Sequence, residues 1–192
     1  MKPDMQRVRG VTLVELVIVI VVIGILALAM GPLALQSLRA YNNTLGDVVV
    51  LDKLRYATER LAREIRAVDF VPGTGFSFAT MGANNMRFTR TLFDAAGAAS
   101  ADTVTVGNTG AAVTLAYAAL PAVGAQILTD QLSSLTFTYL DQNGCVTGNV
   151  TAPCTGTAVT ASNVRMVQID LILTHNGSIY PQRTLIQLKN IN

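Results

Sequence analysis

The chain has 192 residues, of which 51% are hydrophobic and 14% are charged, and its formal net charge is +2. This length allows one modest domain with an attached segment. Lys2, Arg7 and Arg9 outnumber Asp4 before Val11, whereas basic and acidic residues balance in the rest of the chain. The sequence therefore provides no general basic surface, which argues against nucleic acid as a partner.

The hydrophobic residues are concentrated near the N-terminus. Residues 16–35 contain no charge and no side-chain amide. About twenty residues of helix span roughly 30 Å, which is the thickness of the hydrocarbon core of a bilayer. Because basic residues precede this run, we expect the short N-terminal end to remain on the cytoplasmic side and the rest of the chain to cross.

One acidic residue, Glu15, stands at the start of the apolar run. A carboxylate at the centre of a membrane costs about 2.5–3.5 kcal/mol, and less near an interface, so such a group usually has a function. A secretory signal has a shorter apolar stretch and a small-residue cleavage site behind it. A plain signal anchor explains the length of the run but gives Glu15 no role.

The stretch from Arg9 through Gly10, Val11 and Glu15 into the apolar run resembles the class III signal of type IV pilins and type II secretion pseudopilins. The resemblance implies that a prepilin peptidase cleaves between Gly10 and Val11 and methylates the new amino group of Val11. It also implies that Glu15 pairs with the N-terminus of a neighbouring subunit, since an opposite charge offsets much of the cost of a buried one. Valine replaces the phenylalanine or methionine usual in the family.

Two further positions agree with this resemblance. Gly24 and Pro32 coincide with a glycine and a helix-bending proline of the type IVa branch. Pro32 and residues 42–46 predict a bend or a local loosening of the helix.

An amphipathic helix is expected to continue beyond the membrane, with Lys53, Arg60 and Glu64 on its solvated face. The organisation we predict is a leader at 1–10, a transmembrane and filament-core helix at 11–37, an amphipathic helix at 38–70 and a periplasmic β-rich domain at 71–192. The apolar stripe of the amphipathic helix consists of Leu51, Leu54, Leu61, Ile65 and Val68.

The remainder of the chain predicts strands. Leu135, Phe137 and Tyr139 alternate with threonines, which indicates a sheet with one buried face, and the helix at 48–68 is the available cover. The Asn176-Gly177 pair predicts a tight hairpin turn. Residues 94–124 are rich in Ala, Gly and Thr and are expected to form short strands with loops. The expected fold is α+β and pilin-like, with strands at 84–90, 102–106, 112–117, 135–141, 164–174 and 183–189.

Cys145 and Cys154 are the only cysteines and lie beyond the predicted membrane crossing, where pairing is expected. A disulfide closing a loop of about ten residues contributes roughly 2–3 kcal/mol in the chain-entropy model. Their spacing does not fit a redox motif or a metal site. The loop is either a structural staple or, as in pilins with C-terminal disulfide loops, a displayed adhesive feature.

Three other stretches have chemical alternatives that are weaker than the structural ones. His175 has no second ligand or nucleophile nearby in sequence, so we expect a surface residue at a strand end. Residues 141–144 contain part of a calcium-loop pattern, but later ligand positions are occupied by Cys145 and Val146, which favours a turn. Residues 86–93 mix arginine and phenylalanine as single-strand nucleic-acid platforms do, yet exposed arginines on a strand are the better interpretation. We predict no enzyme activity, cofactor, metal or small-molecule substrate.

The last third of the chain resembles, more loosely, minor pilins of the PilW and MSHA-biogenesis kind and the J-type pseudopilin of type II secretion. The segments that carry this resemblance are "TERLAREIRAV" and, far downstream of it, "FTYLDQNG", "VRMVQIDLIL" and "RTLIQLKNIN". It implies a minor type IV pilin, held in the bacterial inner membrane and assembled by a platform protein and an ATPase with other pilin subunits into a surface pilus. The alternatives are a J-type pseudopilin of a periplasmic pseudopilus, and a periplasmic adhesion or binding domain on a simple signal anchor.

Overall fold

The computed structural model describes residues 11–149, 151, 153–154 and 156–189. The leader expected at 1–10, including Gly10 of the predicted cleavage bond, lies outside the described residues. The chain divides into two units, Met1–Gly46 and Asp47–Asn192, and each is considered by itself.

One helix, α1 (Leu13–Arg66), begins in the first unit and ends in the second. Within the first unit its side chains are exposed through Leu45, and the helix is long enough and apolar enough to cross a membrane. Pro32 lies inside the helix and cannot donate the usual backbone hydrogen bond. The expected loosening at residues 42–46 is not a break, because these residues are helical and Thr44 Oγ1 donates to the Ala40 carbonyl at 2.9 Å.

The second unit consists of the C-terminal part of α1 and strands that form three antiparallel sheets. A small pair joins β1 to β2, a second sheet has the order β10-β9-β8, and a third has the order β3-β4-β5-β6-β7. The strands are β1 (Phe70–Val71), β2 (Gly75–Phe76), β3 (Phe78–Met81), β4 (Met86–Phe93), β5 (Ala99–Thr109), β6 (Ala112–Tyr117), β7 (Gln126–Thr129), β8 (Leu132–Leu140), β9 (Met166–His175) and β10 (Ser178–Gln187).

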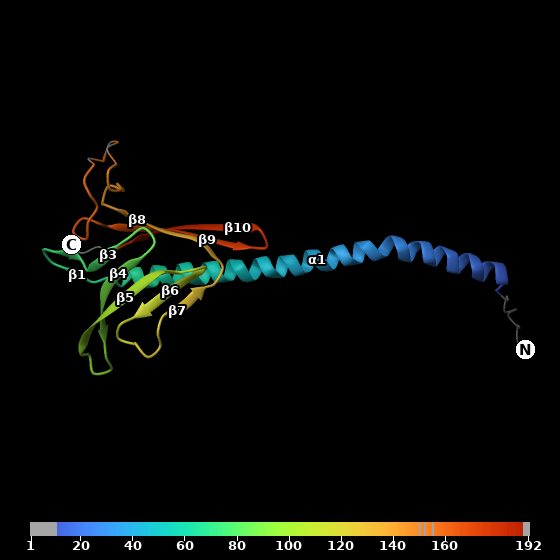
Figure 1. Ribbon diagram of the computed structural model, residues 1–192, viewed down its shortest axis with the longest axis horizontal. Coiled ribbons are helices and arrows are strands. Elements are labelled where there is room, and N and C mark those ends of the chain that lie inside the picture. Colours follow the sequence, from blue (N-terminus) through green and yellow to red (C-terminus); the bar gives the residue numbers. More distant parts are fainter. Residues whose placement is uncertain (1–10, 150, 152, 155, 190–192) are drawn as a thin grey trace, which may run out of the picture. The chain divides into compact units, whose positions relative to one another are not determined.

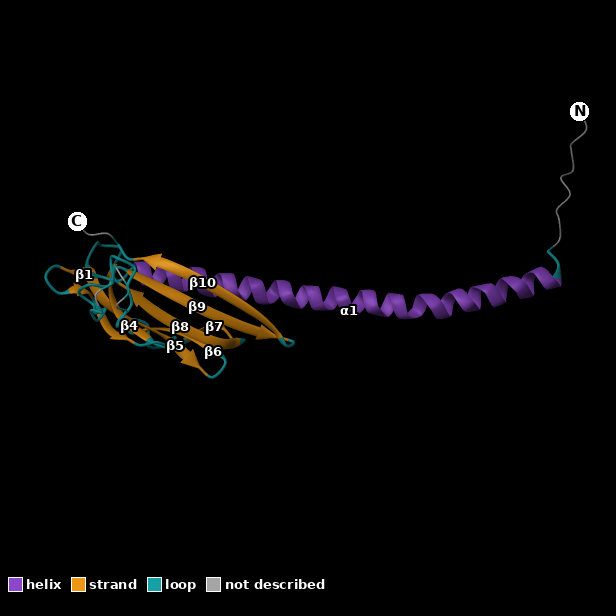
Figure 2. Cartoon of the chain, turned by 90° about the horizontal axis from the view of Figure 1, so that it is seen from above, coloured by secondary structure: helices purple, strands orange, loops and turns teal. Residues whose placement is uncertain are grey.

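The C-terminal part of α1 lies between the two larger sheets (Figure 1). On one side Lys53 Nζ donates to Asp130 beyond β7, and on the other Tyr180 of β10 donates to Asp47 of the helix. The long strands β8, β9 and β10 run obliquely along the helix, as the view from above shows (Figure 2). Two sheets therefore cover this part of the helix, where the sequence predicted one. The buried surface of the helix is correspondingly wider than a single apolar stripe.

The core contains the inward-facing side chains of the helix and of both sheets. In β9 the alternation expected from the sequence is confirmed, because Val167, Ile169, Leu171 and Leu173 are all fully buried. The predicted hairpin turn between β9 and β10 is also present, with φ of 49° at Asn176 and 81° at Gly177. Asparagine and glycine are the residues that adopt these left-handed angles at the lowest cost.

Several local predictions were wrong. Residues 94–124 contain β5, a strand of 11 residues, where short strands were expected. Small Ala and Thr side chains form this strand because β4 and β6 pair with it on both sides. The helix ends at Arg66, four residues before the predicted end at residue 70, and strands β1, β2, β3 and β7 were not predicted. On the helix, Leu51 is half exposed and Glu64 is buried, which reverses their expected sides.

Candidate processing and docking site

The start of α1 is fixed by a cap made from the residues of the proposed processing signal. Thr12 precedes the helix, its Oγ1 accepts a hydrogen bond from the backbone N–H of Glu15 at 3.3 Å, and its carbonyl accepts from Leu16 N–H at 3.2 Å. A threonine followed three residues later by glutamate is the sequence pattern of a capping box. This role of Thr12 was not predicted, although the spacing of Thr12 and Glu15 indicates it.

Glu15 lies in the first turn of α1, where the partial positive charge of the helix N-terminus favours a carboxylate. Its side chain is exposed, and in the described part of the chain it has no ion-pair or hydrogen-bond partner. The neighbours Leu13, Val14 and Leu16 are exposed as well, so the carboxylate lies on a helix surface that is otherwise apolar. The cap explains a glutamate at this position in water, but a membrane setting calls for a cationic partner as well.

The segment around and beyond Glu15 is exposed. Val11 precedes the helix and is 71% exposed, so a cleaved chain would present its amino group freely at this end. Gly24 has no atom within 4 Å of the position a Cβ would take, so no contact within the chain requires glycine there. The apolar side chains along the segment are accessible to lipid or to other helices.

A second group of charged residues lies at the centre of the second unit, where the sequence predicted solvent. The Glu64 carboxylate accepts from Arg90 of β4 at 2.6 Å and from the Tyr117 hydroxyl of β6 at 2.8 Å. Arg60, four residues earlier on α1, lies 3.0 Å from the same carboxylate, and Arg90 also binds Asp102 of β5. Glu64 and Asp102 are almost fully buried, so each negative charge is balanced at contact distance.

This Glu64 cluster also acts on the neighbouring tyrosine. Burial raises the pKa of Tyr117, and its hydrogen bond to Glu64 raises it further. The Arg90 guanidinium lies 4.6 Å from the centre of the Tyr117 ring, in the position of a cation–π contact. These contacts connect α1 to three strands of the larger sheet, and nothing in the local sequence pattern of helix or strand indicates them.

The interpretation of residues 86–93 as a strand with exposed arginines is half wrong. Arg87 is exposed, but the Arg90 side chain is only 17% exposed because the Glu64 cluster binds it. Phe88 is fully buried, whereas Phe93 is 72% exposed. Alternate side chains therefore do not form one accessible stacking face for bases.

Cys145 and Cys154 form a disulfide with Cα atoms 5.6 Å apart. Cys145 is buried. Before it, Asp141 Oδ1 accepts hydrogen bonds from the N–H groups of Asn143 and Cys145, so this carboxylate holds a turn. In the described ranges no group of three His, Cys, Asp or Glu side chains is placed to hold a metal ion.

His175 lies at the end of β9, as predicted. Its two ring nitrogens each lie 3.1 Å from an amide nitrogen, that of Gln131 and that of Asn176. These contacts are typical of a residue that fixes the end of a hairpin.

One comparison with known proteins identifies the N-terminal segment. A family profile described as the prokaryotic N-terminal methylation motif matches residues 5–31. No curated protein matches the chain. The matched residues include the whole proposed processing signal, the cap at Thr12, and Glu15.

A motif of this kind implies processing by a prepilin peptidase and assembly with other pilins, and the apolar helix behind it is compatible with membrane anchoring. Together, the motif and the layout of one long N-terminal helix followed by antiparallel sheets support a type IV pilin-like protein.

Proposed function

We propose that the chain is the precursor of a minor type IV pilin, with a structural and not an enzymatic role. The prepilin peptidase cuts between Gly10 and Val11 on the cytoplasmic side and methylates the amino group of Val11. The second unit lies in the periplasm while α1 holds the chain in the inner membrane. The assembly platform and its ATPase then transfer the subunit into a surface pilus.

One observation carries this proposal: the methylation motif coincides with a capped helix start at which Glu15 has no side-chain partner among the described residues. Residues 5–31 match the motif, Thr12 caps the helix, and the Glu15 side chain is exposed among apolar neighbours. A cation supplied at the same depth in the membrane would offset the cost of that carboxylate. The methylated amine of a neighbouring subunit is such a cation, and it exists only after cleavage.

Pairing of Glu15 with the amine of a neighbouring subunit would fix the axial position of the subunit as well as attract it. Helices that leave lipid for contact with other helices gain little from the hydrophobic effect, because lipid tails are as apolar as leucine. The Glu15 pair would therefore select one axial position among many of similar packing energy. The exposed apolar residues of α1 supply the packing, and Glu15 supplies the specificity.

The same architecture would serve a J-type pseudopilin of a type II secretion system, where the filament remains periplasmic. Isolation of surface pili tests this choice, because a minor pilin is recovered with them and a pseudopilin stays with the cell envelope. A periplasmic adhesion or binding domain on a simple signal anchor is the remaining alternative, and it predicts an uncleaved N-terminus.

Mass spectrometry of the N-terminus from a cell with an active prepilin peptidase tests the processing step. We expect the N-terminal peptide to begin at Val11 and to carry one added methyl group. A Gly10→Val variant is the control and should retain Met1 because the peptidase requires the glycine. An unmodified N-terminus in the parent chain would contradict the proposal.

A pair of variants separates the docking role of Glu15 from its place in the helix cap. Glu15→Gln keeps the size of the side chain and removes its charge, whereas Thr12→Ala removes the cap at a typical cost of about 1 kcal/mol and keeps the charge. We expect both variants to be cleaved and inserted into the membrane. The amount incorporated into filaments should fall at least tenfold below that of the parent for Glu15→Gln and should not fall for Thr12→Ala. An equal loss of filament incorporation in the two variants would mean that Glu15 acts by stabilising the start of the helix and not by docking.

A further inference from the structure

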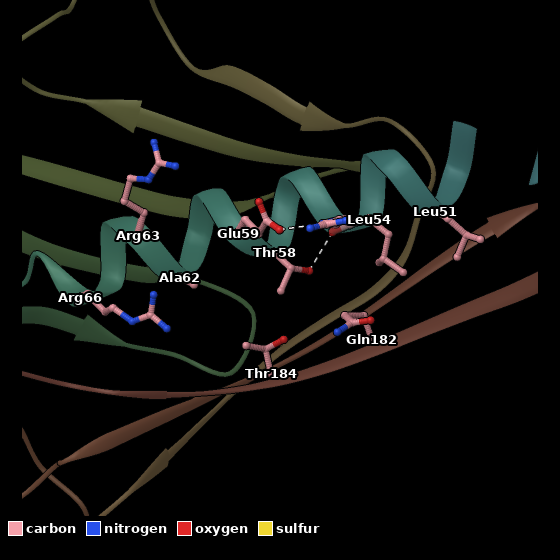
Figure 3. A pocket seen from close by; sticks show the side chains of 10 residues that line it. Leu51, Leu54, Thr58, Glu59, Ala62, Arg63, Arg66, Gln182 and Thr184 are labelled. Atoms are coloured by element: carbon pink, nitrogen blue, oxygen red, sulfur yellow. Dashed lines mark hydrogen bonds and ion pairs between the residues drawn. The ribbon is translucent and has the colours of Figure 1, made fainter. Parts of the chain in front are cut away.

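A groove lies between α1 and the edge strand β10 in the second unit (Figure 3). We call it the α1/β10 groove. Its volume is about 750 Å³, and Gln182 and Thr184 of β10 point into it towards the helix. The helix lines it with Leu51, Leu54, Arg55, Thr58, Glu59, Ala62, Arg63 and Arg66.

The backbone edge of β10 beside this groove is open. The sheet order β10-β9-β8 places β10 at the end, paired with β9 alone. In a two-residue hairpin the residues next to the turn, here His175 and Ser178, are bonded to each other, and every second residue along the strand repeats this. The N–H groups of Arg183 and Leu185 consequently point away from β9, where the part of the chain that the structure describes provides no acceptor.

The position of proline in β10 agrees with this geometry. Pro181 is also at an outward position, where a missing N–H breaks no bond to β9. Proline on an edge strand discourages pairing next to itself. The stretch beyond it, from Arg183 onward, has no such protection, and the Leu185 side chain is 53% exposed.

The groove differs in chemistry between its two ends. Leu51 and Leu54 make one end apolar, and Leu51 is half exposed there. Arg63 and Arg66 make the other end basic, and neither guanidinium has an ion pair or hydrogen bond within the described part of the molecule. Glu59, the acidic residue of the lining, is already bound by Arg55 at 2.8 Å. The basic end is therefore uncompensated.

We propose that the α1/β10 groove binds an extended, acid-bearing peptide segment of another protein, which pairs with the free edge of β10 as a fourth strand. Backbone pairing with Arg183 and Leu185 would supply affinity, as in other cases where a peptide extends a sheet. Alternate side chains of the added strand point towards the helix and fill the groove. Apolar side chains would cover Leu51, and carboxylates would form charge-assisted hydrogen bonds with Arg63 and Arg66.

A second copy of this chain does not supply that segment from its described strands. The other outer strands of the two larger sheets are β3, β7 and β8. Their sequences, FATM, QILT and LSSLTFTYL, contain no acidic residue. The adjacent acids are engaged, Asp130 by Lys53 and Asp141 by its own turn. The complementary charge is therefore assigned to a different protein.

Fluorescent peptides and the detergent-solubilised full chain test the proposal by anisotropy. The probe is a seven-residue peptide, Val-Thr-Val-Thr-Glu-Thr-Glu, whose alternate side chains match the apolar and basic ends of the groove. Its control has lysine in place of both glutamates. We expect saturable binding of the first peptide and at least tenfold weaker binding of the second. No saturable binding at millimolar peptide, or equal binding of the two, would overturn the proposal.

Matched variants locate the bound peptide. Leu185→Pro removes an edge N–H and should abolish binding, whereas Leu185→Ala removes the same side chain, keeps the N–H and should bind within threefold of the parent. Arg63→Glu with Arg66→Glu should weaken binding at least tenfold, and Arg87→Glu, at an exposed arginine on β4, should not change it. Circular dichroism checks that each variant is folded. Equal affinity of the two Leu185 variants, or self-association of the parent that Leu185→Pro removes, would overturn the proposal.

Discussion

Arg90 Nη1 of β4 lies 2.6 Å from Glu64 Oε2 of α1, although the two residues are 26 positions apart in the chain. The Glu64 side chain is 3% exposed and that of Arg90 is 17% exposed. Two charges so far from water must be paired to be tolerated. The contact therefore favours one rotation of the end of α1 about its axis relative to the five-stranded sheet. Apolar packing alone discriminates less strongly between such rotations.

Replacement of Glu64 by glutamine should destabilise the second unit. Glutamine keeps the size of the side chain, but Arg90 and Arg60 lose a negative partner in a buried place. Removing one partner of a buried pair typically costs 3–5 kcal/mol, and we expect about 3 kcal/mol because Asp102 still binds Arg90. Urea unfolding of the detergent-solubilised chain, monitored by near-ultraviolet circular dichroism, measures the change.

The exposed pair Arg55 and Glu59 is the matched control for that variant. It also joins a guanidinium and a carboxylate at 2.8 Å, but both side chains are more than half exposed. Glu59→Gln should change the free energy of unfolding by less than about 1 kcal/mol, as for most surface pairs. Equal effects of the two variants would show that burial does not determine the strength of the Glu64 cluster.

Alkaline pH should destabilise the protein through Tyr139. Burial raises the pKa of this phenol above its ordinary value of 10.0. The folded state therefore holds the proton more tightly than the unfolded chain, so this contribution is complete below pH 10.0 and decreases as the pH rises above it. Tyr139→Phe should flatten the decrease in unfolding free energy above pH 10, at a cost of about 1 kcal/mol at neutral pH for the lost bond to Gly82.

A slope in Tyr139→Phe as steep as in the parent would assign the alkaline sensitivity to another group, with Tyr117 the next candidate because burial raises its pKa too.

Gly75 should tolerate no side chain. Its φ is 102°, and a Cβ there would overlap the Ala161 carbonyl and Ser162 Cα, which are backbone atoms held in place by the bond from Phe76 N–H to the Ala161 carbonyl. We expect Gly75→Ala to cost more than about 3 kcal/mol. Gly73, with φ of 84° but open space around it, isolates the backbone effect, and Gly73→Ala should cost about 1–2 kcal/mol. Similar losses at both positions would exclude close packing as the cause.

Loss of the disulfide should destabilise the chain without unfolding it. The bond closes a loop with a sequence separation of 9, for which the chain-entropy model gives about 2–3 kcal/mol. We expect the double variant Cys145→Ser and Cys154→Ser to lose this amount in urea unfolding. A reducing agent should lower the stability of the parent equally and leave the double variant unchanged. A larger loss would mean that the loop supports the core as well.

Much of the layout was predictable from local pattern. A long uncharged run behind basic residues indicates a membrane helix in any context, because its length and composition are matched to a bilayer. The alternation in β9 and the turn at Asn176-Gly177 were predicted because each depends on the conformational preferences of a few neighbouring residues. Glu15 was singled out for a similar reason, since a lone carboxylate beside an apolar run is conspicuous without any structure.

The presence of a second sheet against α1 and the Glu64 cluster were not predictable in this way. Helical periodicity placed Glu64 with the solvated residues, because charge usually indicates exposure. Its burial depends on Arg90, Asp102 and Tyr117, which three separate strands bring to it. The open edge of β10 is equally a property of strand order, and strand order is set by long-range pairing.

The sequence alone therefore determined the kind of most segments: the proposed processing signal, a membrane-length helix, an amphipathic helix and most of the longer strands. The tertiary structure decided which segments meet, and with that which charges are buried and which strand edge stays free. The physical reason is that periodicity and turn chemistry act over a few residues. The electrostatic balance of Glu64 and the exposure of the β10 edge depend instead on residues tens of positions away, which only folding brings into contact.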